Sequence, residues 1–295
     1  MEIKKVAIIG AGNMGHGIAR TTAVHGFEVV LIDENQEALE RGVSTIKNEL
    51  KRYFVDKEKM TENEYNAIIN RIHAGANLED AVSEVDVVIE AVFEDLDLKK
   101  RLFATIDKYC PPHTIFGSNT STLSITAMGS ATQRADKVIA MHFFNPPDVN
   151  PLVEIAPGLE TSLETIKTTF KFMEMMGKKP MQVKDTPSFV VNRFINALYL
   201  EAARTVQNGI ATADMIDFGV KTALGFRLGP CEMMDYTGLE LIAHGVGKLP
   251  GFEDLYLLRR MVDGGRYGRK NGKGFYDYSP DGSKKVADLS YIAGK

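Results

Sequence analysis

The stretch Lys5-Val6-Ala7-Ile8-Ile9-Gly10-Ala11-Gly12-Asn13-Met14-Gly15 determines the predicted fold of the N-terminal half. Its first five residues form a short, apolar run rich in β-branched side chains, which is typical of a strand buried on both faces. The run leads directly into a GxGxxG pattern, after which apolar residues recur at helical spacing as far as Gly26. The stretch therefore predicts a strand, a glycine-rich turn and a helix in immediate succession.

A second apolar run, Phe27–Ile32, predicts another buried strand, and Asp33 follows it directly. An acid at this place completes the fingerprint of a dinucleotide-binding βαβ unit. In that unit the first glycine allows the tight turn, the second lets the backbone approach a pyrophosphate, and the third lets helix and strand pack closely. The predicted cofactor-binding residues of this unit are Gly10, Ala11, Gly12, Asn13, Met14, Gly15 and Asp33.

Asp33 also predicts which dinucleotide binds. Its carboxylate is expected to accept hydrogen bonds from the adenosine ribose hydroxyls and to repel a 2′-phosphate, so NAD is favoured over NADP. The alternative is that the glycines only form a turn. A turn alone, however, does not require an acid at the end of the second strand.

The pattern of strands and helices continues through the first half. Strands are predicted at 86–90, 114–117 and 137–141, and helices at 35–54, 62–72 and 96–109. Such alternation predicts a parallel sheet with right-handed crossovers, and ligands bind beyond the carboxyl ends of its strands. The polar clusters expected at that edge are Glu94 with Lys99, Ser118-Asn119-Thr120-Ser121, and His142-Phe143-Phe144-Asn145.

The predicted helix 35–54 carries a basic face. Lys47 and Lys51 are four residues apart, and Arg52, Lys57 and Lys59 follow them. This face is interpreted either as an ordinary solvated surface or as a docking surface for a polyphosphate tail.

The alternation stops after Met181-Gln182-Val183. Helices are predicted at 187–208, 212–224, 231–246 and 254–263, with Thr186 as cap and Pro187 at the first position of the first of them. That first helix is apolar nearly all round and is therefore expected to be buried. The predicted organisation is an α/β class protein with a Rossmann-type, mostly parallel sheet domain at 1–184 and a smaller all-α domain at 185–295. Because the helical domain is so apolar, it is also expected to form an oligomer interface.

Composition excludes several other classes of protein. The chain has 295 residues, of which 44% are hydrophobic and 25% charged, and its net charge is −4. This is an ordinary globular mixture, and a general nucleic-acid binder should carry a basic excess. The six histidines and two cysteines show no metal-binding spacing, and no run approaches a membrane span, so no metal, nucleic acid or membrane partner is expected. The predicted location is cytoplasmic.

Three motifs carry a resemblance to a known family. The sequence His142-Phe143-Phe144-Asn145-Pro146-Pro147, together with Ser118–Ser121 and Lys184-Asp185-Thr186-Pro187…Val191-Asn192-Arg193, resembles the L-3-hydroxyacyl-CoA dehydrogenases. The shorter bacterial 3-hydroxybutyryl-CoA dehydrogenases are the most similar group. The resemblance extends from Lys5 to Tyr278, and it implies a homodimer formed through the helical domain.

The resemblance implies an activity and the residues that perform it. The implied reaction is the NAD-dependent oxidation of an acyl-CoA substrate that carries a 3-hydroxyl group, within fatty acid metabolism and β-oxidation. His142 matches the catalytic histidine and Glu154 its carboxylate partner, and Ser121 and Asn192 match residues that contact the substrate. The positions that match the NAD site are Glu94, Lys99, Ser121, Asn145 and Lys270. The family presents a serine and a lysine to CoA, whereas the nearest positions here are Glu49 and either Asp56 or Lys57. The segment 238–256 is also shorter than in relatives.

Chemistry supports these roles independently. Oxidation of a secondary alcohol needs a base for the hydroxyl proton, and histidine is the side chain that titrates near neutral pH. A strand at 149–156 is expected to turn back beside His142 and bring Glu154 to it, as in a triad without its nucleophile. The plainer alternatives are a structural His142, a solvated Glu154, a structural Asn192 amide and a simple surface loop at Lys270. At the level of the whole protein, the alternatives are a dehydrogenase of free hydroxy acids and a non-catalytic NAD-binding scaffold.

Overall fold

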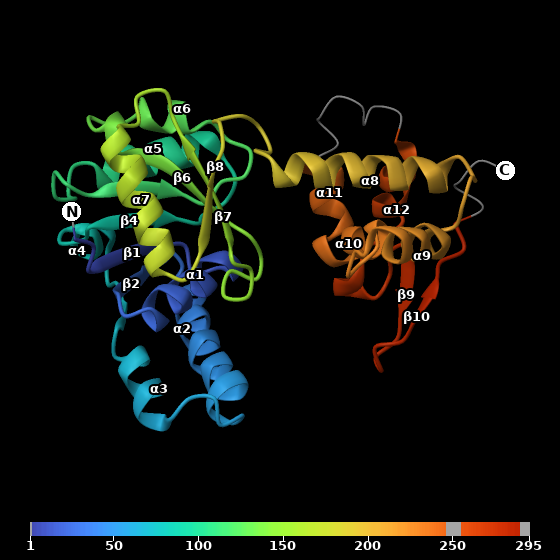
Figure 1. Cartoon of the computed structure of the whole chain (residues 1–295), viewed down its shortest axis with the longest axis horizontal. Coiled ribbons are helices and arrows are strands. Elements are labelled where there is room, and N and C mark those ends of the chain that lie inside the picture. The colour runs from blue at the N-terminus through green and yellow to red at the C-terminus, as the bar shows by residue number, and fades with distance from the viewer. Residues whose placement is uncertain (1, 246–254, 290–295) are drawn as a thin grey trace. The chain divides into compact units, whose positions relative to one another are not determined.

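The computed structural model describes residues 2–245 and 255–289 and divides the chain into two compact units, Met1–Phe189 and Val190–Lys295 (Figure 1). The boundary expected from the sequence, after residue 184, lies shortly before this division. Each of the two cysteines is buried within its own unit, Cys110 in the first and Cys231 in the second.

The first unit is built on an eight-stranded sheet with the strand order β3-β2-β1-β4-β5-β6-β7-β8. All neighbouring strands pair in parallel except β6 and β7, which are antiparallel, so the predicted mostly parallel sheet is confirmed. The strands are β1 (Lys5–Ile9), β2 (Glu28–Ile32), β3 (Ile72–Ala74), β4 (Val87–Glu90), β5 (Ile115–Ser118), β6 (Val138–Phe143), β7 (Leu152–Pro157) and β8 (Lys179–Gln182).

Helices cover both faces of this sheet (Figure 1). Val6 and Ile8 of β1 pack on one face with α1, α2, α3 and α7, whereas Ala7 and Ile9 pack on the other with α4, α5 and α6. Successive side chains of a strand point to opposite faces, so an apolar run such as β1 must be buried on both. The helices are α1 (Asn13–Val24), α2 (Gln36–Leu50), η1 (Lys51–Val55), α3 (Glu62–Ile69), α4 (Leu78–Val82), α5 (Leu96–Ile106), α6 (Ile125–Gly129), η2 (Ala135–Lys137) and α7 (Leu163–Met175).

Two predicted elements of the first unit are wrong at their ends. The helix expected at 62–72 stops at Ile69, because Ile72 begins the short strand β3, which pairs with β2. The helix expected at 35–54 starts as predicted, with the Asn35 side chain capping the amide of Ala38, but it changes to a π-helix from Lys51 to Val55. In the first helix the strand pairing, and in the second the π-helical turn, takes precedence over the α-helix that the spacing of the apolar residues predicts.

The second unit is mainly helical and also contains a small antiparallel sheet that the sequence did not predict. Helix α9 ends at a left-handed glycine, Gly225, as predicted for helix ends. The elements are α8 (Val191–Gln207), α9 (Ala213–Leu224), α10 (Pro230–Thr237), α11 (Leu239–Gly245), α12 (Tyr256–Asp263), η4 (Arg269–Asn271), β9 (Tyr276–Tyr278) and β10 (Lys284–Val286).

Three predictions for the helical region need correction. The helix expected at 187–208 begins only at Val191, because Ser188 (φ 67) and Phe189 (φ 40) adopt left-handed conformations in a turn. It is also not fully buried, since the Phe194 side chain is 73% exposed. The helix expected at 231–246 is divided by Gly238, whose φ of 101 interrupts it.

The ends of two predicted helices, Val246 and Asp254, lie outside the described residues. Residues 246–254 of the segment 238–256, which the resemblance predicts to be shorter than in relatives, lie outside them too. Among the described residues, no helix combines the length and apolar character that a membrane span requires.

Candidate active site

The glycine turn after β1 has the shape that a dinucleotide requires. A Cβ atom added at Gly10 would lie 2.6 Å from the carbonyl oxygen of Ala91, and one at Gly15 would lie 1.7 Å from that of Gly10. At these two positions the neighbouring backbone therefore leaves no room for any residue larger than glycine. A Cβ at Gly12 would meet nothing within 4 Å, so the backbone there is open to a ligand.

Helix α1 begins directly after Gly12, and no described side chain caps it. The first amides of a helix have no partner within the helix and favour an anion. The turn thus offers open backbone and free donors together, which fits the pyrophosphate of NAD. On this geometry, the residues of the glycine turn would hold the cofactor.

Asp33 is tied to the same turn. Its Oδ2 accepts a hydrogen bond from the amide of Ala11 at 2.8 Å, and its Oδ1 accepts one from the amide of Asn35 at 2.9 Å. The carboxylate at the end of β2 is therefore held beside the glycine turn, where the adenosine ribose binds in this type of fold.

Beyond β4 and β5, a network of charged side chains surrounds the second predicted cluster. The Lys99 ammonium, 1% exposed, lies 2.6 Å from Glu90 Oε1 and 3.1 Å from Glu94 Oε2. Glu94 Oε1 accepts hydrogen bonds from the Thr120 hydroxyl, from the amides of Ser121 and Thr122, and from the Thr122 hydroxyl. Glu94 and Lys99 thus hold the loop that carries Ser121.

The pKa of Glu94 reflects these contacts. Burial raises the pKa of this carboxyl, but the charge of Lys99 and the hydroxyl donors of Thr120 and Thr122 outweigh burial and hold it below its ordinary value. Glu94 is therefore ionised at neutral pH.

His142 and Glu154 form a buried pair on neighbouring strands. His142 lies within β6 rather than after it, and its antiparallel partner in β7 is Glu154. The return of the chain beside His142 is thus confirmed, and Glu154 Oε2 lies 2.9 Å from His142 Nδ1. His142 is 6% exposed and Glu154 is 0% exposed, so the strand pairing has placed a histidine and a carboxyl group in contact inside the protein.

Aromatic rings and amides surround the histidine. The ring centroids of Phe144 and Phe189 lie 4.6 and 5.7 Å from that of His142. Asn119 Oδ1 accepts a hydrogen bond from the amide of Phe143 at 2.9 Å, which joins the end of β5 to β6. The Asn145 side chain lies 3.3 Å from that of Asn13 at the start of α1, so the motif around His142 reaches the glycine turn.

The first unit therefore brings together the turn Gly10–Gly15, Asp33, Glu94, Lys99, Ser121, His142, Asn145 and Glu154 at the carboxyl edge of its sheet. The remaining predicted residues, Asn192 and Lys270, belong to the second unit. Asn192 lies in the first turn of α8, and the Lys270 ammonium lies 2.5 Å from Glu240 Oε2.

Several residues of the site were not singled out from the sequence. Glu90 ends a buried strand with a charge, and Ser118 beside it donates to Glu90 Oε2 at 2.6 Å. An acid at the end of an apolar strand was the available signal. Arg20, 5% exposed, pairs with Glu49 and with Asp148. Glu49, one of the positions nearest to the CoA-contacting residues of the family that the sequence resembles, is thus engaged in an ion pair within the protein.

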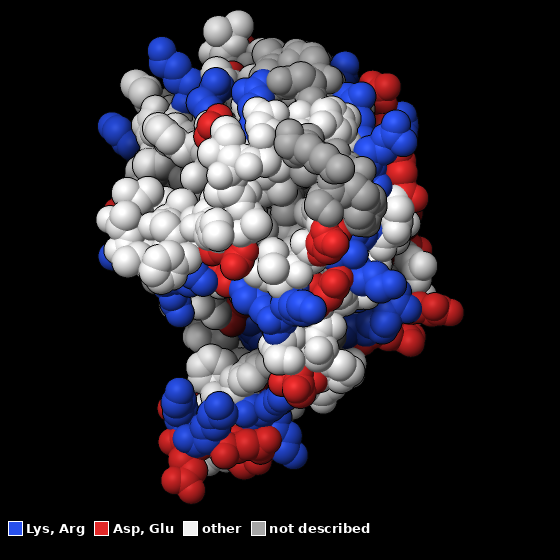
Figure 2. Space-filling model, turned by 90° about the vertical axis from the view of Figure 1, so that its right-hand side faces the viewer, with Lys and Arg blue, Asp and Glu red and all other residues white. Residues whose placement is uncertain are grey.

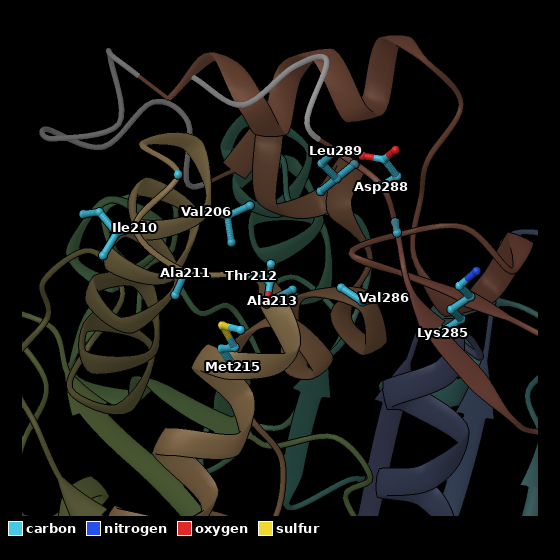
Figure 3. Close-up of a pocket in the computed structure, with 12 residues that line it drawn as sticks. Val206, Ile210, Ala211, Thr212, Ala213, Met215, Lys285, Val286, Asp288 and Leu289 are labelled. Atoms are coloured by element: carbon cyan, nitrogen blue, oxygen red, sulfur yellow. The ribbon is translucent and has the colours of Figure 1, made fainter. Parts of the chain in front are cut away.

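The second unit contains a separate cavity of about 610 Å³. Figure 3 shows side chains from the α8–α9 turn on one side of it and from β10 and the residues after it on the other. Its lining is mostly apolar, with Lys285 and Asp288 as its charged members, and it includes none of the predicted site residues. Among the described residues, no group of three or more His, Cys, Asp or Glu is arranged to bind a metal.

The doubly wound sheet, the glycine turn and the acid at the end of β2 define an NAD-binding oxidoreductase. Comparison with known proteins identifies the family to which it belongs. The family model described as 3-hydroxyacyl-CoA dehydrogenase, NAD binding domain, matches residues 5–186, and that described as 3-hydroxyacyl-CoA dehydrogenase, C-terminal domain, matches residues 189–278. The chain belongs to the 3-hydroxyacyl-CoA dehydrogenase family.

Individual relatives agree with this assignment. The chain is 42% identical to a "Probable 3-hydroxybutyryl-CoA dehydrogenase" of Bacillus subtilis over 94% of this chain and 98% of that one. It is 36% identical to the human mitochondrial hydroxyacyl-coenzyme A dehydrogenase, over 94% and 91% of the two chains. Among solved structures, it matches (S)-3-hydroxybutyryl-CoA dehydrogenase of Ralstonia eutropha with a TM-score of 0.87 and 38% identity, over 94% and 100% of the chains.

Proposed function

We propose that this protein catalyses the reversible, NAD-dependent oxidation of L-3-hydroxyacyl-CoA esters, such as 3-hydroxybutyryl-CoA, to 3-ketoacyl-CoA. The observation that carries this proposal is the buried contact of 2.9 Å between His142 Nδ1 and Glu154 Oε2 at the ligand edge of the sheet. The choice of substrate class is supported by the activities for which the relatives are named.

His142 acts as the general base. With Nδ1–H donating to Glu154, the lone pair is on Nε2, which takes the proton of the substrate hydroxyl. NAD held by the glycine turn would supply the acceptor for the hydride that leaves the same carbon, and the alcohol would thereby become a ketone. In the reverse direction the protonated ring returns its proton to the ketone oxygen.

Glu154 is a positioning residue, since it acts through His142. Its carboxylate fixes the tautomer and orientation of the ring and stabilises the imidazolium that forms when the ring takes a proton. Phe144 and Phe189 pack against the same ring and keep water from it.

The other predicted residues have binding roles in this proposal. Ser121 contacts the substrate hydroxyl and the nicotinamide, and the loop that carries it is held by Glu94. Asn192 contacts the acyl region, where an amide donor stabilises a carbonyl oxygen as charge develops on it. The positions proposed to hold NAD are Gly10, Ala11, Gly12, Asn13, Met14, Gly15, Asp33, Glu94, Lys99, Asn145 and Lys270.

The exposed basic residues of α2 and η1 are proposed to hold the phosphates of CoA. Figure 2 shows Lys and Arg side chains, with acidic ones beside them, at the end of the hairpin formed by α2, η1 and α3. We further propose a homodimer formed through the helical unit, a cytoplasmic location and a place in fatty acid metabolism. The large apolar side chains that α9 exposes, Met215, Phe218 and Leu224, support the dimer.

The test is the consumption of NADH with a series of ketone substrates. Acetoacetyl-CoA and longer 3-ketoacyl-CoA esters should be reduced, and free acetoacetate should be reduced far more slowly. Equal rates with the free acid would favour a dehydrogenase of free hydroxy acids, and NADH binding without turnover of any of these compounds would favour a scaffold.

A further inference from the structure

The buried network at the ends of β4 and β5 contains more negative than positive charge. Glu90 Oε1 accepts hydrogen bonds from the Lys99 ammonium at 2.6 Å and from the amide of Val92 at 2.7 Å. Its Oε2 accepts one from the Ser118 hydroxyl at 2.6 Å. Both oxygens of this fully buried carboxyl group thus face donors.

The groups around the Glu90 carboxyl are each able to donate a hydrogen bond to it. The Ser118 hydroxyl oxygen accepts a hydrogen bond from the amide of Thr120 at 3.2 Å, so its own proton is available to Glu90. The amide of Val92 and the Lys99 ammonium can only donate. The Glu90 carboxyl thus has a possible donor at each of its contacts and forms an ion pair with Lys99.

In this network a single cation, the Lys99 ammonium, pairs with two acidic side chains. Lys99 contacts both Glu90 and Glu94, and Glu94 is ionised because of the donors around it. The sum of the charges of the three side chains is −1. In a poorly solvated region such a charge is screened much less than at the surface, and it acts over a longer distance.

The position of the network relates it to one half of the cofactor. Asp33 and the glycine turn lie at the ends of β2 and β1, where adenosine and pyrophosphate bind. The nicotinamide half therefore extends over the ends of β4, β5 and β6, because the hydride must reach it from the carbon that His142 serves. This last step rests on the function proposed above.

We propose that Glu90, Lys99 and Glu94 form a fixed net negative charge that favours the cationic nicotinamide ring of NAD+ over the neutral ring of NADH. Glu90 is a positioning residue in this network: it holds the Lys99 ammonium from the buried side and adds the second negative charge. The two forms of the cofactor differ by one unit of charge on that ring, so a fixed charge nearby changes their relative affinity.

The experiment measures the dissociation constants of both forms in the absence of substrate. NADH binding is followed by its fluorescence and NAD+ binding by calorimetry, for the intact protein and for Glu90→Gln. This change keeps the size of the side chain and removes one charge. The ratio of the NAD+ to the NADH dissociation constant should rise by about four- to seventeenfold, as one unit charge at roughly 10–20 Å gives in a medium of effective dielectric constant near 20.

Two further variants separate charge from structure. Glu84→Gln removes an exposed carboxylate that pairs with Lys5 at the opposite end of β1, and should leave the ratio unchanged. Ser118→Ala removes a hydrogen bond to Glu90 without removing a charge. It should lower the free energy of unfolding and leave the ratio of the two dissociation constants nearly unchanged. If Glu90→Gln does not fold, Glu94→Gln, whose side chain is 40% exposed, should shift the ratio in the same direction.

An equal loss of affinity for both forms in Glu90→Gln would show a purely structural role and would overturn the inference. So would an unchanged ratio in a folded variant, or the same shift in Glu84→Gln. Because no substrate is present, these results leave the proposed function intact. That function fails instead if the intact protein binds NADH and reduces no 3-ketoacyl-CoA.

Discussion

Gly12 allows the shape of the cofactor site to be tested without disturbing the fold. Its φ of −65 and ψ of −169 are accessible to any residue, and a Cβ atom there meets nothing within 4 Å. Gly12→Ala should therefore fold normally, and a stability gain of about 0.4–1 kcal/mol is expected from the reduced freedom of the unfolded chain. The added methyl group occupies the space into which the pyrophosphate must come, so NADH affinity should fall at least ~tenfold, or about 1.4 kcal/mol.

Thermal unfolding with and without NADH measures both effects at once. At a concentration of 100 times its dissociation constant, NADH should stabilise the intact protein by about 2.7 kcal/mol. A tenfold weaker site should gain only about 1.4 kcal/mol at the same concentration. The matched control is Gly219→Ala in α9, where a Cβ also meets nothing within 4 Å and full stabilisation by NADH should remain.

Wild-type NADH affinity in a folded Gly12→Ala variant would refute the assignment of the turn as the pyrophosphate site. Gly15→Ala gives the opposite pattern. Its Cβ would lie 1.7 Å from the Gly10 carbonyl oxygen, so this variant should lose stability whether or not NADH is present.

Three other predictions concern cofactor choice, CoA and pH. The kcat/KM of the intact protein should be at least ~tenfold higher with NAD(H) than with NADP(H). Asp33→Asn, which retains an acceptor for the Ala11 amide, should lower the ratio of these two kcat/KM values. Equal kcat/KM values of the intact protein with the two cofactors would contradict the role of Asp33. Reversing the charges of Lys47 and Lys51 should raise KM for acyl-CoA with little change in kcat, and added salt should likewise raise this KM in the intact protein. The control Lys171→Glu, on the exposed side of α7, should change neither KM nor kcat. An unaltered KM in the double variant would argue against a CoA-binding surface on α2. Burial raises the pKa of Asp235 from 3.8 to about 6, so the folded state binds this proton more tightly than the unfolded chain does, and the free energy of unfolding should decrease by up to ~3 kcal/mol as pH rises through that range. Asp235→Asn should flatten the dependence of the free energy of unfolding on pH between these values, as measured by chemical denaturation. The same pH dependence in the variant as in the intact protein would contradict this prediction.

The parts of the fold that the sequence predicts well are those fixed by local chemistry. The apolar run before Gly10, the glycine turn and the acid at the end of β2 each have one physical interpretation in that order, and the structure has them all. The capping of α2 by Asn35 and the end of α9 at Gly225 are equally local.

The parts that could not be predicted depend on contacts between distant residues. The turn at Ser188 and Phe189 follows from a hydrogen bond between the amide of Ser188 and the carbonyl of Ser121, which no local pattern shows. Glu90 illustrates the same limit at the site. A single acid in an apolar strand becomes informative only when the structure brings Lys99 and Ser118 to its two oxygens.

The central claim is that His142 and Glu154 act together as the base, and the kinetics of their variants test it most directly. In NADH consumption with acetoacetyl-CoA, His142→Ala should lose about 10²–10⁴-fold in kcat with NADH affinity unchanged, and Glu154→Gln should lose less. The double variant should be little slower than His142→Ala alone, because residues that act as a unit are not additive. A His142→Ala enzyme that retains its kcat would contradict the mechanism, and fully multiplicative losses would show that Glu154 acts independently of His142.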